Sequence, residues 1–525
     1  MGSNTYTVGS NFPSQLPIAK DVTDGIAIDS GVNAGVSKPC NAYTRMNEEW
    51  FVIKSLLGGT SAMRKADKTF LPMEVGEAEA AYQNRLKRSV LFNGFKRTVG
   101  ILSSKPFLRP VDYGDMHETL KEYCDNIDLE GNRLDLFLWQ RMYNALSYGH
   151  TFILVDHSKG AGHPVSKKDV VDLGLRPFWR GYSPLDIVGW QYENLNGRPV
   201  LTQARIKEFV QKNEGDYGSY TAEQIKVLEI GSWKVYEKDK NGNWPLIDEG
   251  QFLDYRGKPL RFIPLIPIYF DQTDFFTSRP PLLDLAYLNV HHWQSYSDYA
   301  NILHVAQVPI LFGKGFDEDT QVVVGASSMI PGPPESDLKF VEHSGKAIES
   351  GNNGIMAIED RMRVMGSELL SKSKGVVTAT QRTLENEENL SDLQRMALNM
   401  ADGANQALEI TALLAGVPVE EIGEITLFTD FSIMLNRVED VKNLLAIRVA
   451  RQMTQVTFLE ECKRRGVLSD GLDVELEMKI LKEEESRMAD FSMDEMPEDE
   501  DEDEDENQDD EDQDDRGQNQ DKGTE

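Results

Sequence analysis

A single helical pattern fills residues 282–306, LLDLAYLNVHHWQSYSDYANILHVA, and its length limits the folds open to the chain. At a rise of 1.5 Å per residue such a helix spans about 37 Å. Pro280 and Pro281 precede the pattern, and proline is favoured in the first turn of a helix. The helix is amphipathic, so its apolar stripe needs packing partners along its length. The fold must therefore supply other long elements, or neighbouring subunits, beside it.

Two further helical patterns follow this one after a small β-rich segment. Residues 307–350 hold the apolar runs VPILFG, VVVGAS and LKFVEHSG, with PGPPE between the last two, which predicts a small β module. Residues 354–372 place apolar side chains at spacings of three and four, typical of a helix. A third helix is predicted over about 382–415, on the order of 50 Å long. It ends at LLAGVP, where glycine and then proline stop a helix.

The N-terminal half mixes helices and strands. Residues 1–40 are rich in Gly, Ser, Asn and Pro and lack periodicity, so we expect a flexible arm. Helices are predicted over about 43–57 and over roughly 77–103. The stretch RMYNALSYGHTFILVDH predicts a helix that turns into a strand near Gly149.

The segment from Gly149 to Phe270 is mostly β in pattern. Asn241-Gly242 predicts a hairpin turn. RFIPLIPIYF is apolar but contains two prolines, which favours an edge or irregular strand. The fold class predicted for this part of the chain is α+β.

The C-terminal part holds one predicted strand, EITLFTDFSI, two helices over about 437–465 and 471–488, and an acidic tail. Residues 494–525 contain 19 acidic and 2 basic residues, so the tail carries about half of the net charge of -32. Such a composition is typical of a disordered, solubilising segment. Its like charge would make it repel DNA.

Composition excludes several classes of protein. The cysteines, Cys40, Cys124 and Cys462, form no close pair and no zinc spacing, so we expect reduced thiols in a cytoplasmic setting. The N-terminus lacks the pattern of a signal peptide. No run of 18 apolar residues occurs, so we expect no membrane span.

The sequence carries no catalytic signature. It contains no phosphate-binding glycine loop, no HExxH and no GxSxG, so we expect no enzyme activity and no cofactor. His291 and His292 are adjacent and point apart on a helix, and neither is four residues from His304, so we expect no metal site. Carboxylates such as Asp156 keep a Mg²⁺-dependent nucleic-acid-processing enzyme as an alternative.

A basic stretch runs from Arg85 to Arg109, with seven basic residues and no acidic one. One interpretation is contact with nucleic-acid phosphates. The other is a solvated helix face, or salt bridges to acidic neighbours or other subunits. Because no aromatic residues suggest base stacking, we favour the second.

The stretch SKSKGVVTATQ, residues 371–381, separates two strong helical patterns. Gly375 and the β-branched Val376, Val377 and Thr378 weaken helix continuation. Lys372 and Lys374 put two mobile charges in the same loop. By itself the pattern predicts only an interhelical loop.

Taken together, several stretches resemble the portal proteins of tailed bacteriophages. More narrowly, the chain is similar to a portal-like phage family long labelled only as a domain of unknown function. The resemblance spans roughly residues 43–435 and lies in the order of its motifs, which are RPFWRGYSPLDIVGWQ, PPLLDLAYLNVHHWQSYSDYANILHVAQVPIL, KFVEHSGKAI and TATQ before the long helix.

The resemblance implies an α+β, portal-like fold. Its parts are a flexible N-terminal arm (1–40), an α+β wing (41–281), a first stem helix (282–306), a small β-rich clip (307–352), a second stem helix (353–372), a tunnel loop (373–381), a long spine helix (382–416), a strand returning to the wing (417–436), a helical crown (437–490) and an acidic disordered tail (491–525).

The resemblance also implies a role and partners. The chain would form a homo-oligomeric ring, usually a dodecamer, at the capsid vertex of a virion assembled in the host cytoplasm. The ring would pass double-stranded DNA without reading its sequence during packaging and ejection. Further partners would be the terminase motor, the major capsid protein, a scaffolding protein and a head-to-tail adaptor, with no membrane.

Two sets of site residues follow from the resemblance. The tunnel loop would line the DNA channel through Lys372, Lys374, Gly375, Val376, Val377 and Thr378. The clip would dock the motor and the connector through Ile330, Pro331, Gly332, Pro333, Pro334 and Glu335. Besides the enzyme, a monomeric structural adaptor without a channel remains an alternative.

Overall fold

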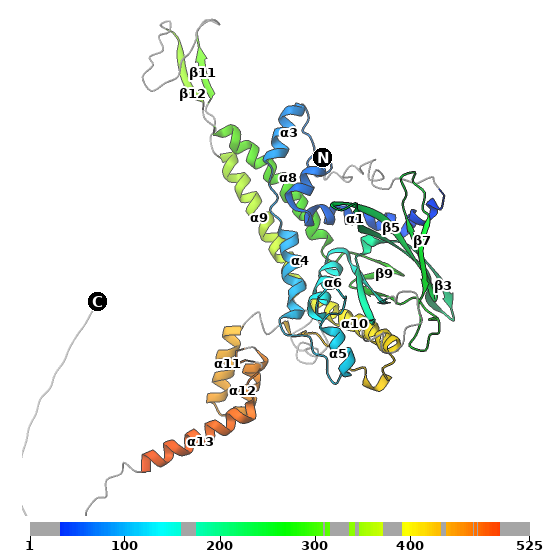
Figure 1. The fold of residues 1–525 in the computed structure, drawn as a ribbon. Coiled ribbons are helices and arrows are strands. Elements are labelled where there is room, and N and C mark those ends of the chain that lie inside the picture. The colour runs from blue at the N-terminus through cyan, green and yellow to red at the C-terminus, as the bar shows by residue number, and fades with distance from the viewer. Residues whose placement is uncertain are drawn as a thin grey trace, which may run out of the picture. The chain divides into compact units, whose positions relative to one another are not determined.

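The structure, a computed structural model, has an α+β fold (Figure 1). It describes residues 32–158, 175–307, 310–315, 335–341, 346–370, 391–431, 437–465, 467–469 and 471–493. The chain divides into two compact units, residues 1–431 and residues 432–525. No helix among the described residues is long and apolar enough to cross a membrane.

Helices dominate both ends of the described chain. They are α1 (Asn41–Leu57), α2 (Gly59–Lys65), α3 (Glu79–Arg88), α4 (Gly94–Ser104), α5 (Glu118–Cys124), α6 (Leu134–Tyr148), α8 (Leu283–Ala306), α9 (Lys346–Glu368), α10 (Asp392–Ala415), α11 (Arg437–Val449), α12 (Gln455–Arg464) and α13 (Val474–Met493).

The strands lie mostly between α6 and α8. They are β1 (His150–His157), β2 (Pro177–Tyr182), β3 (Ile187–Leu195), β4 (Arg198–Glu214), β5 (Gly218–Glu229), β6 (Ser232–Glu237), β7 (Leu246–Gln251), β8 (Leu265–Tyr269), β9 (Gln272–Asp274), β10 (Thr277–Ser278), β11 (Ile310–Lys314) and β12 (Asp337–Val341).

A three-stranded antiparallel sheet, in the order β2-β1-β8, forms the centre of the first unit. α6 leads into β1 through Gly149, which has a φ of 93° and whose missing side chain leaves room for Ser278 and the Arg279 carbonyl. The predicted helix-to-strand turn at Gly149 is confirmed. β8 pairs only with β1, so the predicted edge strand is also confirmed, and an edge is where a strand tolerates Pro267.

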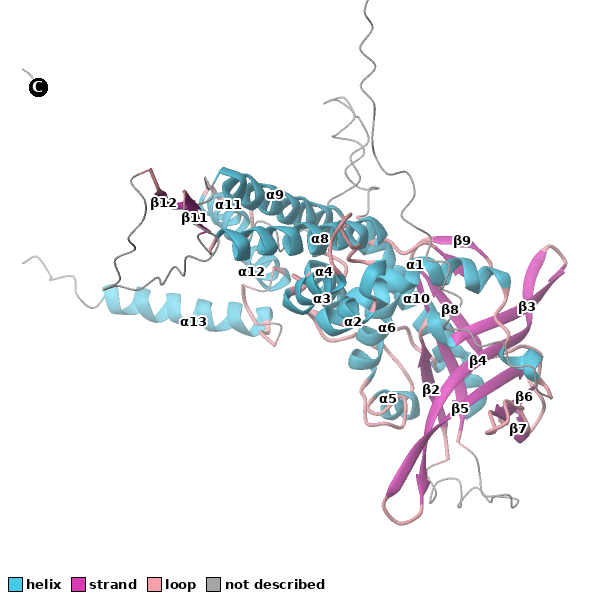
Figure 2. Cartoon of the chain, turned by 90° about the horizontal axis from the view of Figure 1, so that it is seen from above, coloured by secondary structure: helices cyan, strands magenta, loops and turns pink. Residues whose placement is uncertain are grey.

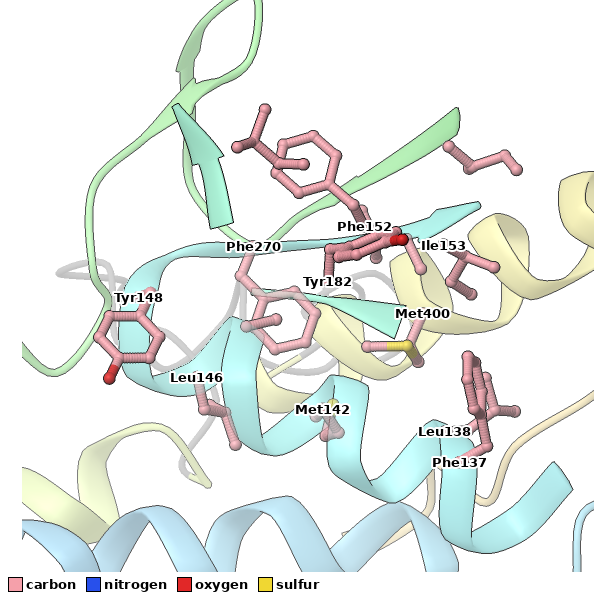
Figure 3. Packing of buried hydrophobic residues seen from close by; sticks show 14 of the residues in the cluster. Phe137, Leu138, Met142, Leu146, Tyr148, Phe152, Ile153, Tyr182, Phe270 and Met400 are labelled. Atoms are coloured by element: carbon pink, nitrogen blue, oxygen red, sulfur yellow. The ribbon is translucent and has the colours of Figure 1, made fainter. Parts of the chain in front are cut away.

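The core forms where α6 and α10 pack against this sheet. Figure 3 shows Met142 and Leu146 of α6 near Phe152 and Ile153 of β1, with Met400 of α10 beside them. All five side chains are almost fully buried. Burial of large apolar side chains contributes about 1.5–3 kcal/mol each, so this contact is a main source of stability for the unit.

α10 approaches β8 closely because a glycine faces the strand. A Cβ on Gly403 would collide with the side chain of Ile268. Next to this contact, the Asn399 side chain donates to the Tyr269 carbonyl at 3.0 Å. Helix and strand are thus held by both packing and a hydrogen bond, although they lie far apart in the sequence.

A second, five-stranded antiparallel sheet runs in the order β3-β4-β5-β6-β7 (Figure 2). A buried ion pair links it to β1, since Lys226 Nζ of β5 lies 2.6 Å from Asp156 Oδ2. The predicted hairpin around Asn241-Gly242 is confirmed between β6 and β7, where Gly242 has a φ of 80°. Asp156 is thus a structural ion-pair partner in this structure.

Two predicted helix boundaries are wrong. The single helix expected over 77–103 is two helices, α3 and α4, because residues 89–93 leave the helical path and the Asn93 side chain caps α4 by accepting from Lys96 N at 3.0 Å. The helix expected from 382 begins as α10 at Asp392, because Ser391 is extended and forms a capping box with Gln394. Residues 382–390 lie outside the described residues.

Two more expectations are corrected. α9 begins at Lys346, before the predicted 354. In its described part, residues 424–431, EITLFTDFSI forms one β-bridge, from Thr426 to Asp112, because the Asn405 side chain bonds to both the N–H and the C=O of Ile425.

The second unit contains α11, α12 and α13, and α12 contacts both of the others. The helix predicted over 437–465 is broken between α11 and α12, since Arg451 has a φ of 57° and Thr454 caps α12 through Thr457 N at 3.2 Å. A residue in the left-handed region ends one helix and the capping hydroxyl starts the next.

Gly403→Ala should destabilise the protein by about 1–3 kcal/mol, because the new Cβ forces α10 away from Ile268. Urea unfolding followed by tryptophan fluorescence measures the change. Gly100→Ala in α4 is the matched control, since a Cβ there meets nothing within 4 Å. The control should raise the free energy of unfolding by about 0.5–1 kcal/mol, because alanine is favoured over glycine inside a helix. Equal effects of the two substitutions would contradict the close contact between α10 and β8.

Candidate assembly site

The candidate site is the helical hairpin made by α8 and α9 with β11 and β12 between them. The two helices are antiparallel neighbours, since Tyr299 lies beside Gly351 near one end and His292 Nε2 lies 3.2 Å from Glu359 Oε1 further along. β11 and β12 pair antiparallel from Ile310 with Val341 to Lys314 with Asp337. Two of the three strands predicted for the β module are confirmed, and the third, VVVGAS, lies outside the described residues.

α8 is anchored to the turn between α3 and α4 by one buried side chain. Asn289 Oδ1 accepts from Phe95 N at 2.8 Å, and its Nδ2 donates to the Phe92 carbonyl at 2.8 Å. Asn289 has no exposed surface. The Phe95 N–H is one of the groups that a helix start leaves without an intrahelical partner, and the Phe92 carbonyl accepts from Gly94 N as well. The asparagine therefore helps to fix where α4 begins and where α8 sits.

α4 also contacts α9 at two glycines. Gly94 of α4 leaves room for the Met362 side chain, and Gly366 of α9 would place a Cβ 2.9 Å from Thr98 Cγ2. The α8–α9 pair is therefore covered by α3 and α4 on one side, an arrangement that Figure 2 shows from above.

The first residue of the basic stretch is structural. Arg85 is almost fully buried, and its guanidinium lies 2.8 Å from Glu77 Oε2 and 3.5 Å from Asp298 Oδ1. Hydrogen bonding to Arg85 lowers the pKa of Glu77. This residue fits the salt-bridge interpretation of the stretch, whereas Lys87, Lys96 and Arg97 are exposed.

The other side of the α8–α9 pair carries an open trough. It consists of two adjoining hollows of about 730 Å³ and about 500 Å³ that share His291 and Arg361. Tyr287 and Val364, 39% and 56% exposed, present apolar surface in the larger hollow. Burial first, then the carboxylates of Glu49 and Asp284, raise the pKa of Tyr287, so this end of the trough is acidic.

The histidines of α8 play separate parts. His291 is exposed and lines the trough, whereas His292 is buried and lies 5.1 Å from the Phe92 ring. Across the described ranges of the chain, no three His, Cys, Asp or Glu side chains gather as a metal site would require.

The loop residues predicted for the DNA channel, Lys372, Lys374, Gly375, Val376, Val377 and Thr378, lie outside the described residues, but the chain on both sides of them is described. Leu393 N, in the first turn of α10, donates to Leu369 O, just after α9, at 3.1 Å. The described chain before residue 371 and after residue 390 therefore lies at nearly one point. Sequence reasoning missed this closure, because a hydrogen bond across an intervening segment has no local signal.

Most of the predicted clip residues are also outside the described residues. These are Ile330, Pro331, Gly332, Pro333 and Pro334. Glu335 is described and exposed, two residues before β12 begins. Gly315, after β11, has a φ of 81° and lies close to Glu335 and Ser336, so the two strands end together.

Comparisons with known proteins were made for the whole chain. Residues 281–414, from the start of α8 to α10, match the family described as a domain of unknown function, DUF4055. Among curated proteins, none matches the chain.

Solved structures of gene transfer agent particles contain chains with a limited likeness to this one. A chain from the virion of a native particle has 12% identity and a TM-score of 0.36, with 77% of this chain and 98% of that chain covered. A chain from the neck of an empty particle, computed with C6 symmetry, has 13% identity and a TM-score of 0.35, covering 70% and 88%. A chain from the neck of a native particle, computed with C12 symmetry, has 12% identity and a TM-score of 0.33, covering 69% and 87%.

Asn289→Leu should destabilise the protein by about 1–3 kcal/mol, because it leaves the Phe95 N–H buried without a partner and removes one of the two donors to the Phe92 carbonyl. Chemical unfolding measures the loss. Asn353→Leu on the exposed side of α9 is the matched control and should change stability by less than about 0.5 kcal/mol. A neutral Asn289→Leu would show that α8 does not depend on this anchor.

Proposed function

We propose that this chain is a structural subunit of a phage-like particle and, more specifically, a portal protein whose copies form a ring around a DNA channel at one capsid vertex. The observation that carries the proposal is the element order within 281–414. Two antiparallel helices are separated by a β-hairpin, and a segment with joined ends then leads into α10. Three of the four sequence stretches that resemble portal proteins lie within residues 280–381, and the fourth, RPFWRGYSPLDIVGWQ, lies at residues 176–191 in β2 and β3.

The physical argument for a ring starts from the α8–α9 pair. One side is covered by α3 and α4, and the other leaves the apolar trough open. Soluble monomers rarely expose continuous apolar surface of this kind, so a neighbouring subunit is the natural cover. In this proposal residues 41–281 form the wing, α8 and α9 the stem, α10 the spine and residues 437–490 the crown.

The segment 371–390 is proposed as the part that meets DNA. The described residues on both sides of it, Leu369 and Leu393, are joined by a backbone hydrogen bond, which holds the end of α9 next to the start of α10. Two lysines per subunit, Lys372 and Lys374, give a weak grip on phosphates, and weak binding suits a channel through which DNA must move. The contact would go to the DNA backbone, without reading bases.

Lys372→Ala with Lys374→Ala should leave assembly normal but change DNA packaging or retention. The effect should shrink at high salt, because charge contacts with phosphates are screened. Packaging assays over a range of salt concentrations measure it. Packaging and retention equal to the parent at every salt concentration would reduce the loop to a simple connection.

The β module between α8 and α9 is proposed as the clip, which docks the packaging motor and later the head-to-tail connector. It is inserted at the end of both stem helices, away from their contacts with α1 and α4. Deleting residues 330–337 should abolish motor binding in a pull-down and leave the stem helices folded. If the deletion variant still binds the packaging motor, the β module is not the docking site for the motor.

Electron microscopy and native mass spectrometry of the purified chain test the proposal as a whole. A ring with a central hole is expected. A monomer at all concentrations and salt levels would favour the adaptor alternative, and nuclease activity that depends on Mg²⁺ would favour the enzyme.

A further inference from the structure

Four residues of the basic stretch 85–109 are exposed at the ends of α3 and α4 that face each other, and of these Arg88 donates to the Asn301 side chain of α8 at 3.1 Å. Lys87 and Arg88 end α3, and Lys96 and Arg97 lie in the first turn of α4. Within the described part of the chain, neither Lys96 nor Arg97 has a carboxylate at ion-pair distance, and both are exposed. We call the surface of Lys96, Arg97 and the half-exposed Ile101 the basic ridge.

The basic ridge and the open trough face different directions from the α4–α9 contact. Successive helical residues turn by about 100°. Thr98 contacts Gly366 of α9, so Lys96, two residues earlier, points away from α9. Arg97 and Ile101 are turned from Thr98 by about 100° and about 60°, so they lie on the flank of α4 beside the contact with α9. Val364 lies two residues from both Met362 and Gly366, which face α4, so Val364 points away from α4. A subunit thus presents two different surfaces to two different sides.

The charges of the two surfaces are complementary. Exposed Asp284 and Asp360 line the larger hollow of the trough, and Glu48 and Glu49 lie near Tyr287. Within the chain Asp284 lies 3.8 Å from an Arg279 nitrogen and Asp360 lies 2.7 Å from an Arg363 nitrogen, so the basic ridge would share these carboxylates with two exposed arginines. Arg361 also lines the larger hollow and contributes a positive charge to it. The ridge offers two bases and no acid. In a chain with a net charge of -32, copies repel one another unless a local basic surface meets an acidic one.

We propose that the open trough of one copy receives the basic ridge of a second copy. Lys96 and Arg97 would pair with Asp284 and Asp360, while Ile101 would cover Tyr287 and Val364. Because the two surfaces differ, the contact is head-to-tail, and repeated head-to-tail contacts close a ring when the rotation allows it. This inference rests on the proposed ring and names the surfaces that build it.

Charge reversal on each surface tests the inference. The ridge variant carries Lys96→Glu and Arg97→Glu, and the rim variant carries Asp284→Lys and Asp360→Lys. Each variant alone places like charges across every contact, so each should remain monomeric by analytical ultracentrifugation. An equimolar mixture should restore the ring, because every contact between the two variants again joins opposite charges. In the mixed ring the two variants alternate.

Matched controls reverse exposed charges elsewhere on the first unit. Lys121→Glu with Lys258→Glu controls for the ridge variant, and Glu122→Lys with Glu130→Lys controls for the rim variant. Both controls should assemble like the parent. Thermal unfolding of every variant shows that it is folded. If a reversal prevents folding, Lys96→Gln with Arg97→Gln replaces it and should raise the concentration for half-assembly by about tenfold or more.

The outcomes separate this inference from the proposed function. If the parent forms a ring and the folded single-surface variants do too, only the ridge–trough contact is overturned. The ridge–trough contact is also overturned if both variants are monomeric and their mixture remains monomeric. It is overturned as well if the glutamine variant assembles like the parent. If the parent itself is always monomeric, the proposed ring and this contact both fail.

Discussion

One backbone hydrogen bond, from Leu393 N to Leu369 O at 3.1 Å, joins the end of the α8–α9 pair to the start of α10. α10 in turn lies on β1 and β8, where Gly403 admits Ile268. The helical pair is therefore connected mechanically to the core of the first unit through its last residues. The same bond places the end of α9 beside the start of α10, although twenty residues, 371–390, lie between the described parts of the chain.

The α8–α9 pair owes its position to polar groups as much as to packing. Asn289 satisfies two backbone groups of another element, and Arg85 is buried against Glu77 and Asp298. Breaking a buried pair of this kind costs several kcal/mol because the remaining group is left without a partner. Such groups fix one orientation of α8, so the trough on the opposite side keeps a defined shape.

The basic stretch shows how one motif serves two purposes. Arg85 at its start is buried and paired with carboxylates, while Lys96 and Arg97 are exposed to solvent. A sequence shows only that these bases occur without acids among them. Which of them are paired depends on elements far away in the chain, such as α8, which carries Asp298.

Local sequence patterns determined the elements with strong periodicity. The helix at 282–306, the turn at Gly149 and the hairpin around Gly242 depend on residues within a few positions of one another, so they were predictable and are confirmed. The α+β class follows from the same patterns, as does the placing of a small β module between two helices.

Only the tertiary structure decided the breaks and the site. The interruption between α3 and α4 depends on Asn289, almost two hundred residues away, and the late segment around Ile425 pairs with the Asn405 side chain in place of a sheet. The trough exists because α4 covers one side of the helical pair and nothing among the described residues fills the other. These features rest on contacts between distant residues, and the free energy of such contacts is absent from any local pattern.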